Sequence, residues 1–155
     1  MIKNRVSVCL AAAAAGIMLA MPAQAQVRDA EYRGTLVCEN LPFAVGQNRA
    51  AIVVKLTGNE GPYERTVHLS GSRKVVGTET GSAKVDGDKI SLTGAWKGEK
   101  DGYEASYAGT FVRRRAKLSG TQKWMHDGQS FTRNCSGSIQ RPLAAFLPKP
   151  QKPAQ

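Results

Sequence analysis

Apolar and aromatic residues alternate with polar ones through most of the second half of the chain, and this period of two constrains the fold most. Successive side chains of a β-strand point to opposite faces of its sheet, so an alternating segment buries one face and exposes the other. The pattern therefore predicts an all-β domain built from half-buried strands. The residues of the apolar parity are Ile90, Leu92, Gly94, Trp96, Tyr103, Ala105, Tyr107, Gly109, Phe111, Ala116, Leu118, Gly120, Trp124, Phe131, Cys135 and Ile139.

Turn signals separate these alternating segments. Three dipeptides accept the positive φ angles that tight hairpins require, namely Asp86-Gly87, Asp101-Gly102 and Asp127-Gly128. The first half of the chain adds strand-like segments at 32–39, 50–57, 63–69 and 74–85. We therefore predict eight strands joined by sequential hairpins, which form an antiparallel meander, and no long helix.

Two cysteines indicate how this meander ends. Cys38 lies on the first predicted strand and Cys135 on the last. A disulfide between them requires these strands to be neighbours, which only a closed barrel, or something near it, achieves. We therefore predict an eight-stranded antiparallel up-and-down barrel closed by one disulfide between its first and last strands. In the chain-entropy model, closing a loop of this length stabilises the fold by about 4 to 5 kcal/mol.

The N-terminus has the pattern of a secretory signal peptide. Lys3 and Arg5 precede an apolar run from 6 to 21, and Ala23-Gln24-Ala25 offers a small-x-small cleavage site. No stop-transfer charge cluster follows, so we expect cleavage after Ala25 and no transmembrane span in the mature form. Export also agrees with the disulfide, because such bonds persist in oxidising compartments. The expected location is periplasmic or secreted.

The predicted domain organisation is simple. Residues 1–25 form the signal peptide, 26–140 the barrel domain and 141–155 a proline-rich tail. The formal net charge of +10 favours anionic partners, but we expect a solvated basic surface without a specific partner ahead of a dedicated anion site. The basic run 113–115 is expected in a tight turn without the flanking aromatic platforms typical of nucleic-acid readers, so nucleic-acid binding is not expected.

The sequence offers little for catalysis. His68 and His126 are the two histidines, and a metal site normally needs three or four ligands. No arrangement of nucleophile, base and orienting acid is evident. We therefore expect no catalytic residues, no metal site and no cofactor.

One predicted end of the barrel is better suited to binding. The connection from Asn40 to Arg49 is long for a hairpin and carries Leu41, Phe43 and Val45. Apolar loop residues of this kind cover either their own core or a ligand, and the sequence leaves both open. An eight-stranded barrel is likewise either filled by side chains or wide enough for one small ligand. The candidate ligand-binding residues at this mouth are Leu41, Phe43, Trp96, Tyr107, Trp124 and Arg133.

Several short segments resemble the calycin group, which contains the lipocalins and avidins. Leu92 to Trp96 resembles the G-x-W signature, and 107–111 and 118–122 are similar to avidin strands. A last-strand arginine that packs on tryptophan is a further calycin feature, and Arg133 matches it. The resemblance implies a small up-and-down barrel. It does not imply biotin binding, because Lys97-Gly98 follows Trp96 where avidins carry a biotin-contacting asparagine.

The leading functional expectation is an exported, non-catalytic barrel. It would bind a small amphipathic or anionic ligand, or an anionic component of the cell envelope, through the mouth beside 40–49. The first alternative is a periplasmic inhibitor that inserts this connection into a lysozyme or protease. The second is a structural or assembly factor with no ligand. Ligand-induced quenching of tryptophan fluorescence would favour the first function, and capture of a periplasmic hydrolase would favour the inhibitor.

Overall fold

The structure, a computed structural model, describes residues 29–44, 48–68 and 74–142. No helix in these ranges has the length and apolar character needed to cross a membrane. The predicted signal peptide at 1–25 and all but the first two residues of the predicted tail at 141–155 lie outside them. Both therefore stay predictions.

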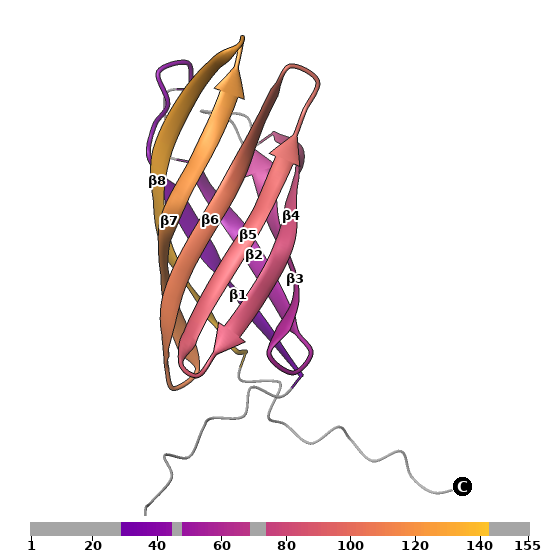
Figure 1. Ribbon diagram of the computed structural model, residues 1–155, viewed down its shortest axis with the longest axis vertical. Coiled ribbons are helices and arrows are strands. Elements are labelled where there is room, and N and C mark those ends of the chain that lie inside the picture. Colours follow the sequence, from indigo (N-terminus) through magenta and orange to yellow (C-terminus); the bar gives the residue numbers. More distant parts are fainter. Residues whose placement is uncertain (1–28, 45–47, 69–73, 143–155) are drawn as a thin grey trace, which may run out of the picture.

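Eight antiparallel strands follow one another around a closed barrel, as the alternation predicts (Figure 1). They are β1 (Ala30–Cys38), β2 (Asn48–Leu56), β3 (Glu60–His68), β4 (Val75–Asp86), β5 (Lys89–Lys97), β6 (Asp101–Val112), β7 (Arg115–His126) and β8 (Gln129–Gln140). This is the small up-and-down barrel that the resemblance to calycins implies.

The seam between β1 and β8 is closed by backbone pairing and by the predicted disulfide. Cys38 lies directly opposite Cys135 in the antiparallel register, and their sulfur atoms are bonded. The pairing continues along the seam as far as Arg33 and Gln140. Because β1 also pairs with β2, the barrel has no free sheet edge.

The two ends of the barrel differ in their connections. At the lower end in Figure 1 lie the tight turns β2–β3, β4–β5 and β6–β7, together with the start of β1 and the end of β8. At the opposite end, here called the upper mouth, lie β1–β2, β3–β4, β5–β6 and β7–β8. Part of the β1–β2 connection (45–47) and of the β3–β4 connection (69–73, including Arg73) lies outside the described residues.

Turn chemistry explains most of the hairpins. Asp127 and Gly128 both have positive φ, at 48° and 76°, and Gly87 has a φ of 59°, as hairpin turns require. The predicted turn at Asp101-Gly102 is wrong, because both residues belong to β6. The turn precedes them, where the backbone nitrogen of Gly98 donates to the carbonyl of Asp101 at 2.7 Å. Gly102 instead permits a close approach, since a Cβ there would lie 3.0 Å from the carbonyl oxygen of Trp96.

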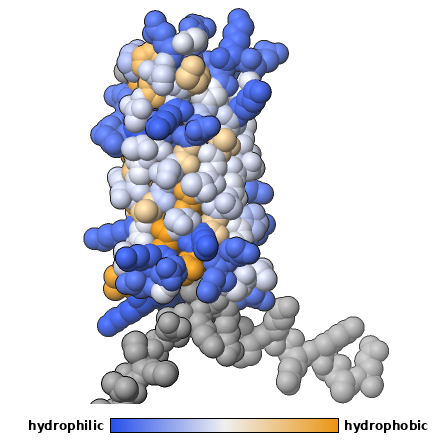
Figure 2. All heavy atoms as spheres, viewed as in Figure 1, coloured by the Kyte–Doolittle hydropathy of each residue, from blue (hydrophilic) through white to orange (hydrophobic). Residues whose placement is uncertain are grey.

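The barrel interior changes character along its axis. The lower half is filled by aliphatic and small side chains, whereas the upper half holds a polar network beneath an aromatic cluster. The outer wall is polar, and Figure 2 shows its most hydrophilic side chains towards the two ends, with a paler band between them. The buried aliphatic and small residues towards the lower end include Ala30, Val54, Leu56, Ala83, Val85, Ile90, Leu92, Ala116, Leu118 and Ile139.

Candidate functional site

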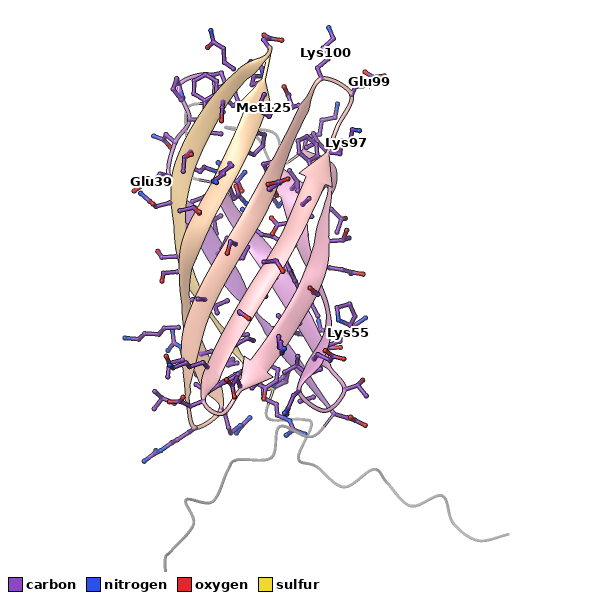
Figure 3. The ribbon with its side chains drawn as sticks, in the orientation of Figure 1. Glu39, Lys55, Lys97, Glu99, Lys100 and Met125 are labelled. Carbon is purple, nitrogen blue, oxygen red and sulfur yellow. A yellow bond between two sulfur atoms is a disulfide. The ribbon has the colours of Figure 1, made fainter. Side chains whose placement is uncertain are left out.

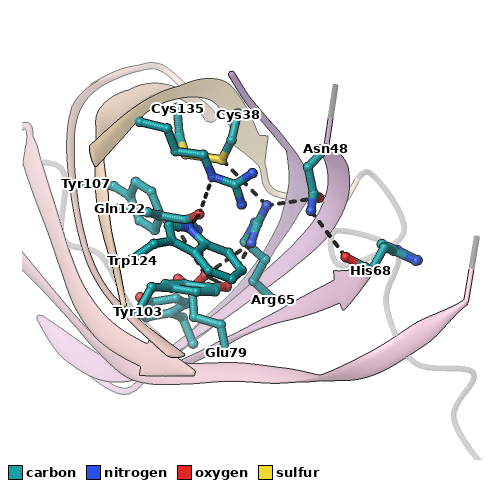
Figure 4. A network of polar contacts seen from close by, with 12 residues as sticks. Cys38, Asn48, Arg65, His68, Glu79, Tyr103, Tyr107, Gln122, Trp124 and Cys135 are labelled. Carbon is teal, nitrogen blue, oxygen red and sulfur yellow. Dashed lines mark hydrogen bonds and ion pairs between the residues drawn. A yellow bond between two sulfur atoms is a disulfide. The ribbon is translucent and has the colours of Figure 1, made fainter. Parts of the chain in front are cut away.

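A buried carboxylate, Glu79, organises the polar network (Figure 4). Its Oε1 accepts a hydrogen bond from the Tyr63 hydroxyl at 2.8 Å. Its Oε2 accepts from the hydroxyls of Tyr103 at 2.6 Å and Tyr107 at 3.2 Å, and from Gln122 Nε2 at 3.1 Å. With Arg65 added, Oε2 has four protein donors and Oε1 has one.

Arg65 is the cation paired with this carboxylate, and neither side chain is exposed. Its Nη1 lies 3.2 Å from Glu79 Oε2 and donates to the Tyr103 hydroxyl at 3.0 Å. Its Nη2 donates to Asn48 Oδ1 at 3.3 Å and lies 3.5 Å from Cys38 Sγ. The ion pair therefore links β3 and β4 to the disulfide seam.

The tyrosines around Glu79 are held in their neutral form. Burial raises the pKa of Tyr63, Tyr103 and Tyr107 above the ordinary tyrosine range, and the negative charge of Glu79 raises it further. Each hydroxyl donates its proton to the carboxylate, and ionisation would destroy that hydrogen bond. The network is thus stable only while these hydroxyls are protonated.

Arg133 is the second buried cation, and only 3% of it is exposed. Its Nε donates to Gln122 Oε1 at 2.8 Å, and its guanidinium carbon lies 4.9 Å from the centroid of the Trp124 ring. This confirms the predicted packing of the last-strand arginine on tryptophan. Gln122 connects the two halves of the network, because its amide nitrogen faces Glu79 while its oxygen faces Arg133.

The charges of the network do not balance. The buried charged residues in the described part of the chain are Arg65, Arg133 and Glu79, which leaves one excess positive charge. Burial lowers the pKa of Arg133 to about 10, and the nearby charge of Arg65 lowers it too. Its Nη1 reaches only the carbonyl of Glu39, at 3.4 Å, and its buried Nη2 has no hydrogen-bond partner among the described residues.

An aromatic cluster covers this network at the upper mouth. Tyr103 and Trp124 are in contact, with ring centroids 4.5 Å apart, and Trp96 lies 5.8 Å from each of them. Glycines make room for Trp96: a Cβ at Gly77 would lie 2.2 Å from its Nε1, and one at Gly98 would lie 2.9 Å from its ring. Both tryptophans of the chain therefore report on this one end.

The β1–β2 connection adds a further aromatic ring to the cluster. Phe43 stacks on His126 with centroids 4.0 Å apart and meets Phe131 and Trp124 edge-on at 5.1 and 6.0 Å. The connection is held by paired backbone hydrogen bonds between Leu41 and Ala44, and Leu41 is buried. Phe43 thus lies across part of the mouth rather than projecting from it.

Charged side chains surround the mouth. Lys97, Glu99 and Lys100 are grouped at the upper end in Figure 3, and both lysines are exposed. The imidazole of His126, which carries the Phe43 ring, lies 2.5 Å from Asp101. The rim therefore has charges of both signs, with exposed lysines on the β5–β6 side.

The structure brings most of the predicted ligand-binding residues together. Leu41, Phe43, Trp96 and Trp124 lie at the upper mouth, and Arg133 lies directly beneath Trp124. Tyr107 lies deeper, where it contacts Glu79. The described residues contain no group of three possible metal ligands.

Three members of the network were not predicted from the sequence: Arg65, Glu79 and Gln122. A signal was present for two of them, because Arg65 shares the parity of Tyr63 and Val67, and Gln122 that of Gly120 and Trp124. Glu79 had no comparable signal, since glycines interrupt the alternation of β4.

No protein-family model matches this sequence, and no curated protein matches it. Function is therefore argued from the geometry of the upper mouth.

Proposed function

We propose that this protein is an exported, non-catalytic binding protein whose upper mouth accepts a small amphipathic ligand or the apolar part of an envelope component. The aromatic cluster would contact the apolar body of the ligand, and charged side chains at the rim or beneath it would contact its polar parts. The disulfide supports export, because it persists in oxidising compartments.

The observation that carries this proposal is the position of Phe43. A residue of a connection, not of a strand, contributes its ring to a cluster that already contains Trp124 and Phe131. It is held there by ring contacts with Trp124, Phe131 and His126, and its segment is closed by the Leu41–Ala44 backbone hydrogen bonds. Such a segment can move without unpairing any barrel strand, and its movement would expose Trp124 and Arg133 to a ligand.

The contact of Phe43 with its own barrel makes the inhibitor function the second candidate. A loop that inserts into a hydrolase must present its side chains outward, whereas Phe43 contacts its own barrel and Leu41 is buried. None of the described residues at this mouth gives evidence for a structural or assembly role.

Intrinsic fluorescence tests the proposal directly, because Trp96 and Trp124 are the two tryptophans of the chain and both lie at the mouth. A panel of decyl amphiphiles with carboxylate, alcohol and trimethylammonium head groups should include at least one that shifts the emission saturably. The Phe43→Ala protein should bind that amphiphile more weakly, by about tenfold if the lost ring buries a typical aromatic surface in the complex, while its melting temperature stays nearly unchanged.

Arg113→Ala is the matched control, because Arg113 occupies the β6–β7 turn at the lower end of the barrel. It should change neither affinity nor folding. An emission spectrum that responds to no member of the panel would refute the small-ligand proposal. The inhibitor alternative would then be tested by capture of periplasmic hydrolases.

A further inference from the structure

We propose that Arg133 is the anchor for one singly charged carboxylate, which enters the upper mouth with its charged end first. The choice of mouth rests on the proposed function. The inference adds that the ligand carries one carboxylate with a single negative charge, and that this carboxylate enters first.

The buried charges of the described residues leave one positive charge unbalanced. Two buried guanidinium groups share one buried carboxylate among the described residues, and that carboxylate is paired with Arg65. Glu79 already accepts from three tyrosines and Gln122 in addition, and Arg133 is not among its hydrogen-bond donors. One further monovalent anion would neutralise the network, whereas a dianion would reverse its charge.

The guanidinium of Arg133 has donor capacity that the described residues do not use. Nε is used by Gln122, Nη1 makes one long contact to the carbonyl of Glu39, and Nη2 is buried with no partner among the described residues. A buried donor without an acceptor is unfavourable, and a cationic donor more so. The two terminal nitrogens of a guanidinium match the spacing of two carboxylate oxygens, which makes a planar carboxylate the best-fitting partner.

A ligand that enters from the upper mouth would reach Arg133 by passing the aromatic cluster. Trp124 covers one face of the Arg133 guanidinium, and Phe43 lies against the edge of Trp124. The path from the mouth to Arg133 therefore passes the aromatic cluster, and an apolar chain that follows the carboxylate would remain among Trp96, Trp124 and Phe43. The rim, which has charges of both signs, would then contact no charged group of the ligand.

A comparison of decanoate with decanol tests the charge requirement, with tryptophan emission as the readout. Wild-type protein should bind decanoate more tightly by about tenfold or more, as expected for a charge-assisted, two-point hydrogen bond. Arg133→Met should abolish this preference, so that both amphiphiles bind equally. Lys117→Met, which removes an exposed positive charge from β7, should preserve it.

Acetate separates two sources of the same carboxylate chemistry. If a free small carboxylate is the natural occupant, sodium acetate should raise the melting temperature of wild-type protein but not of Arg133→Met, and decanoate should compete with it. If a lipid-like acid is the occupant, decanoate should saturate at concentrations where acetate has no effect. Both outcomes support the anchor.

Equal binding of decanoate and decanol by wild-type protein, with no effect of acetate, would overturn the anchor while leaving the proposed function intact. A decanoate preference that persists in Arg133→Met would overturn it as well. Failure of every amphiphile to change the emission would instead refute the proposed function. Circular dichroism of Arg133→Met checks its fold, which we expect to be retained because Gln122 Oε1 still accepts from Trp124 Nε1 at 3.1 Å.

Discussion

Glu79 is the single residue on which the hydrogen bonds of the buried polar network converge. Side chains of β3, β6 and β7 donate hydrogen bonds to its carboxylate from inside the barrel. A buried ion pair of this kind adds little net stability by itself, because the desolvation of both charges offsets their attraction. The surrounding tyrosines make the network more favourable, since their hydroxyls donate three further hydrogen bonds to the carboxylate.

The four tyrosines should make the protein sensitive to alkaline pH. Burial raises the pKa of all of them in the folded state: Tyr32, Tyr63, Tyr103 and Tyr107. Above about pH 10 the unfolded chain releases tyrosine protons that the folded protein keeps, so the free energy of unfolding falls as pH rises. Each affected tyrosine contributes a slope of about 1.4 kcal/mol per pH unit.

Arg133 acts in the opposite direction but with less weight. Its pKa is lowered to about 10, so between this value and the ordinary arginine range the unfolded state binds one more proton, which favours folding as pH rises. One arginine opposes several tyrosines, and the net effect is alkaline unfolding. The ultraviolet absorbance of tyrosinate should therefore rise together with the loss of circular dichroism. A tyrosine that ionises near pH 10 in the still folded barrel would contradict this expectation.

At the scale of the element, β4 is adapted to its neighbours by its glycines. Gly77 and Gly81 lie where the strand faces Trp96 and Tyr63, and a Cβ at either position would come within 2.5 Å of the facing ring. Glycine lowers the intrinsic β-propensity of the strand, but at these two positions it allows two large side chains to pack directly against the backbone. A register shift between Val67 and His68 accompanies this packing at the upper end of the β3–β4 pair.

Replacing Gly77 with alanine should displace Trp96 from its position. The new Cβ would lie 2.2 Å from the indole nitrogen, so the ring must leave its present position and its contacts with Tyr103 and Trp124 must change. We expect a red-shifted tryptophan emission and a loss of stability of about 1 to 3 kcal/mol, which is typical of overpacking. Thr78→Ala, on the exposed face of the same strand, is the control and should leave the emission unchanged. An unaltered spectrum in Gly77→Ala would show that Trp96 is not held by this contact.

At the scale of the whole molecule, the seam between β1 and β8 makes the sheet a barrel. The bond from Cys38 to Cys135 spans 97 residues, so it restricts nearly all of the unfolded domain. Arg65 also contacts Cys38, so the disulfide forms part of the wall around the polar network. Closure of the sheet and placement of the buried charges therefore depend on the same pair of strands.

The double variant Cys38→Ala, Cys135→Ala should keep the barrel but lose stability. The chain-entropy model predicts a loss of about 4 to 5 kcal/mol in the free energy of unfolding, because the unfolded chain regains the freedom of the long loop. Denaturant titration measures this loss. Reductant should lower the midpoint of the wild-type transition and leave that of the variant unchanged. A variant with the wild-type midpoint would show that backbone pairing alone secures the seam.

The sequence by itself determined the all-β class, the eight strands and the barrel closure. Each of these follows from a local regularity: a period of two, turn dipeptides, or a cysteine on each terminal strand. Local patterns suffice because side-chain direction in a strand depends only on position along it.

Only the tertiary structure decided which inward side chains meet. Gln122 and Glu79 are 43 positions apart, and their contact depends on the accumulated register of four strands, which no local pattern specifies. A shift of one strand by two residues would keep every parity and give Arg65 a different partner. Local patterns also could not tell whether Phe43 covers its own barrel. Its position depends on contacts with His126 and Phe131, which lie on strands distant in the sequence.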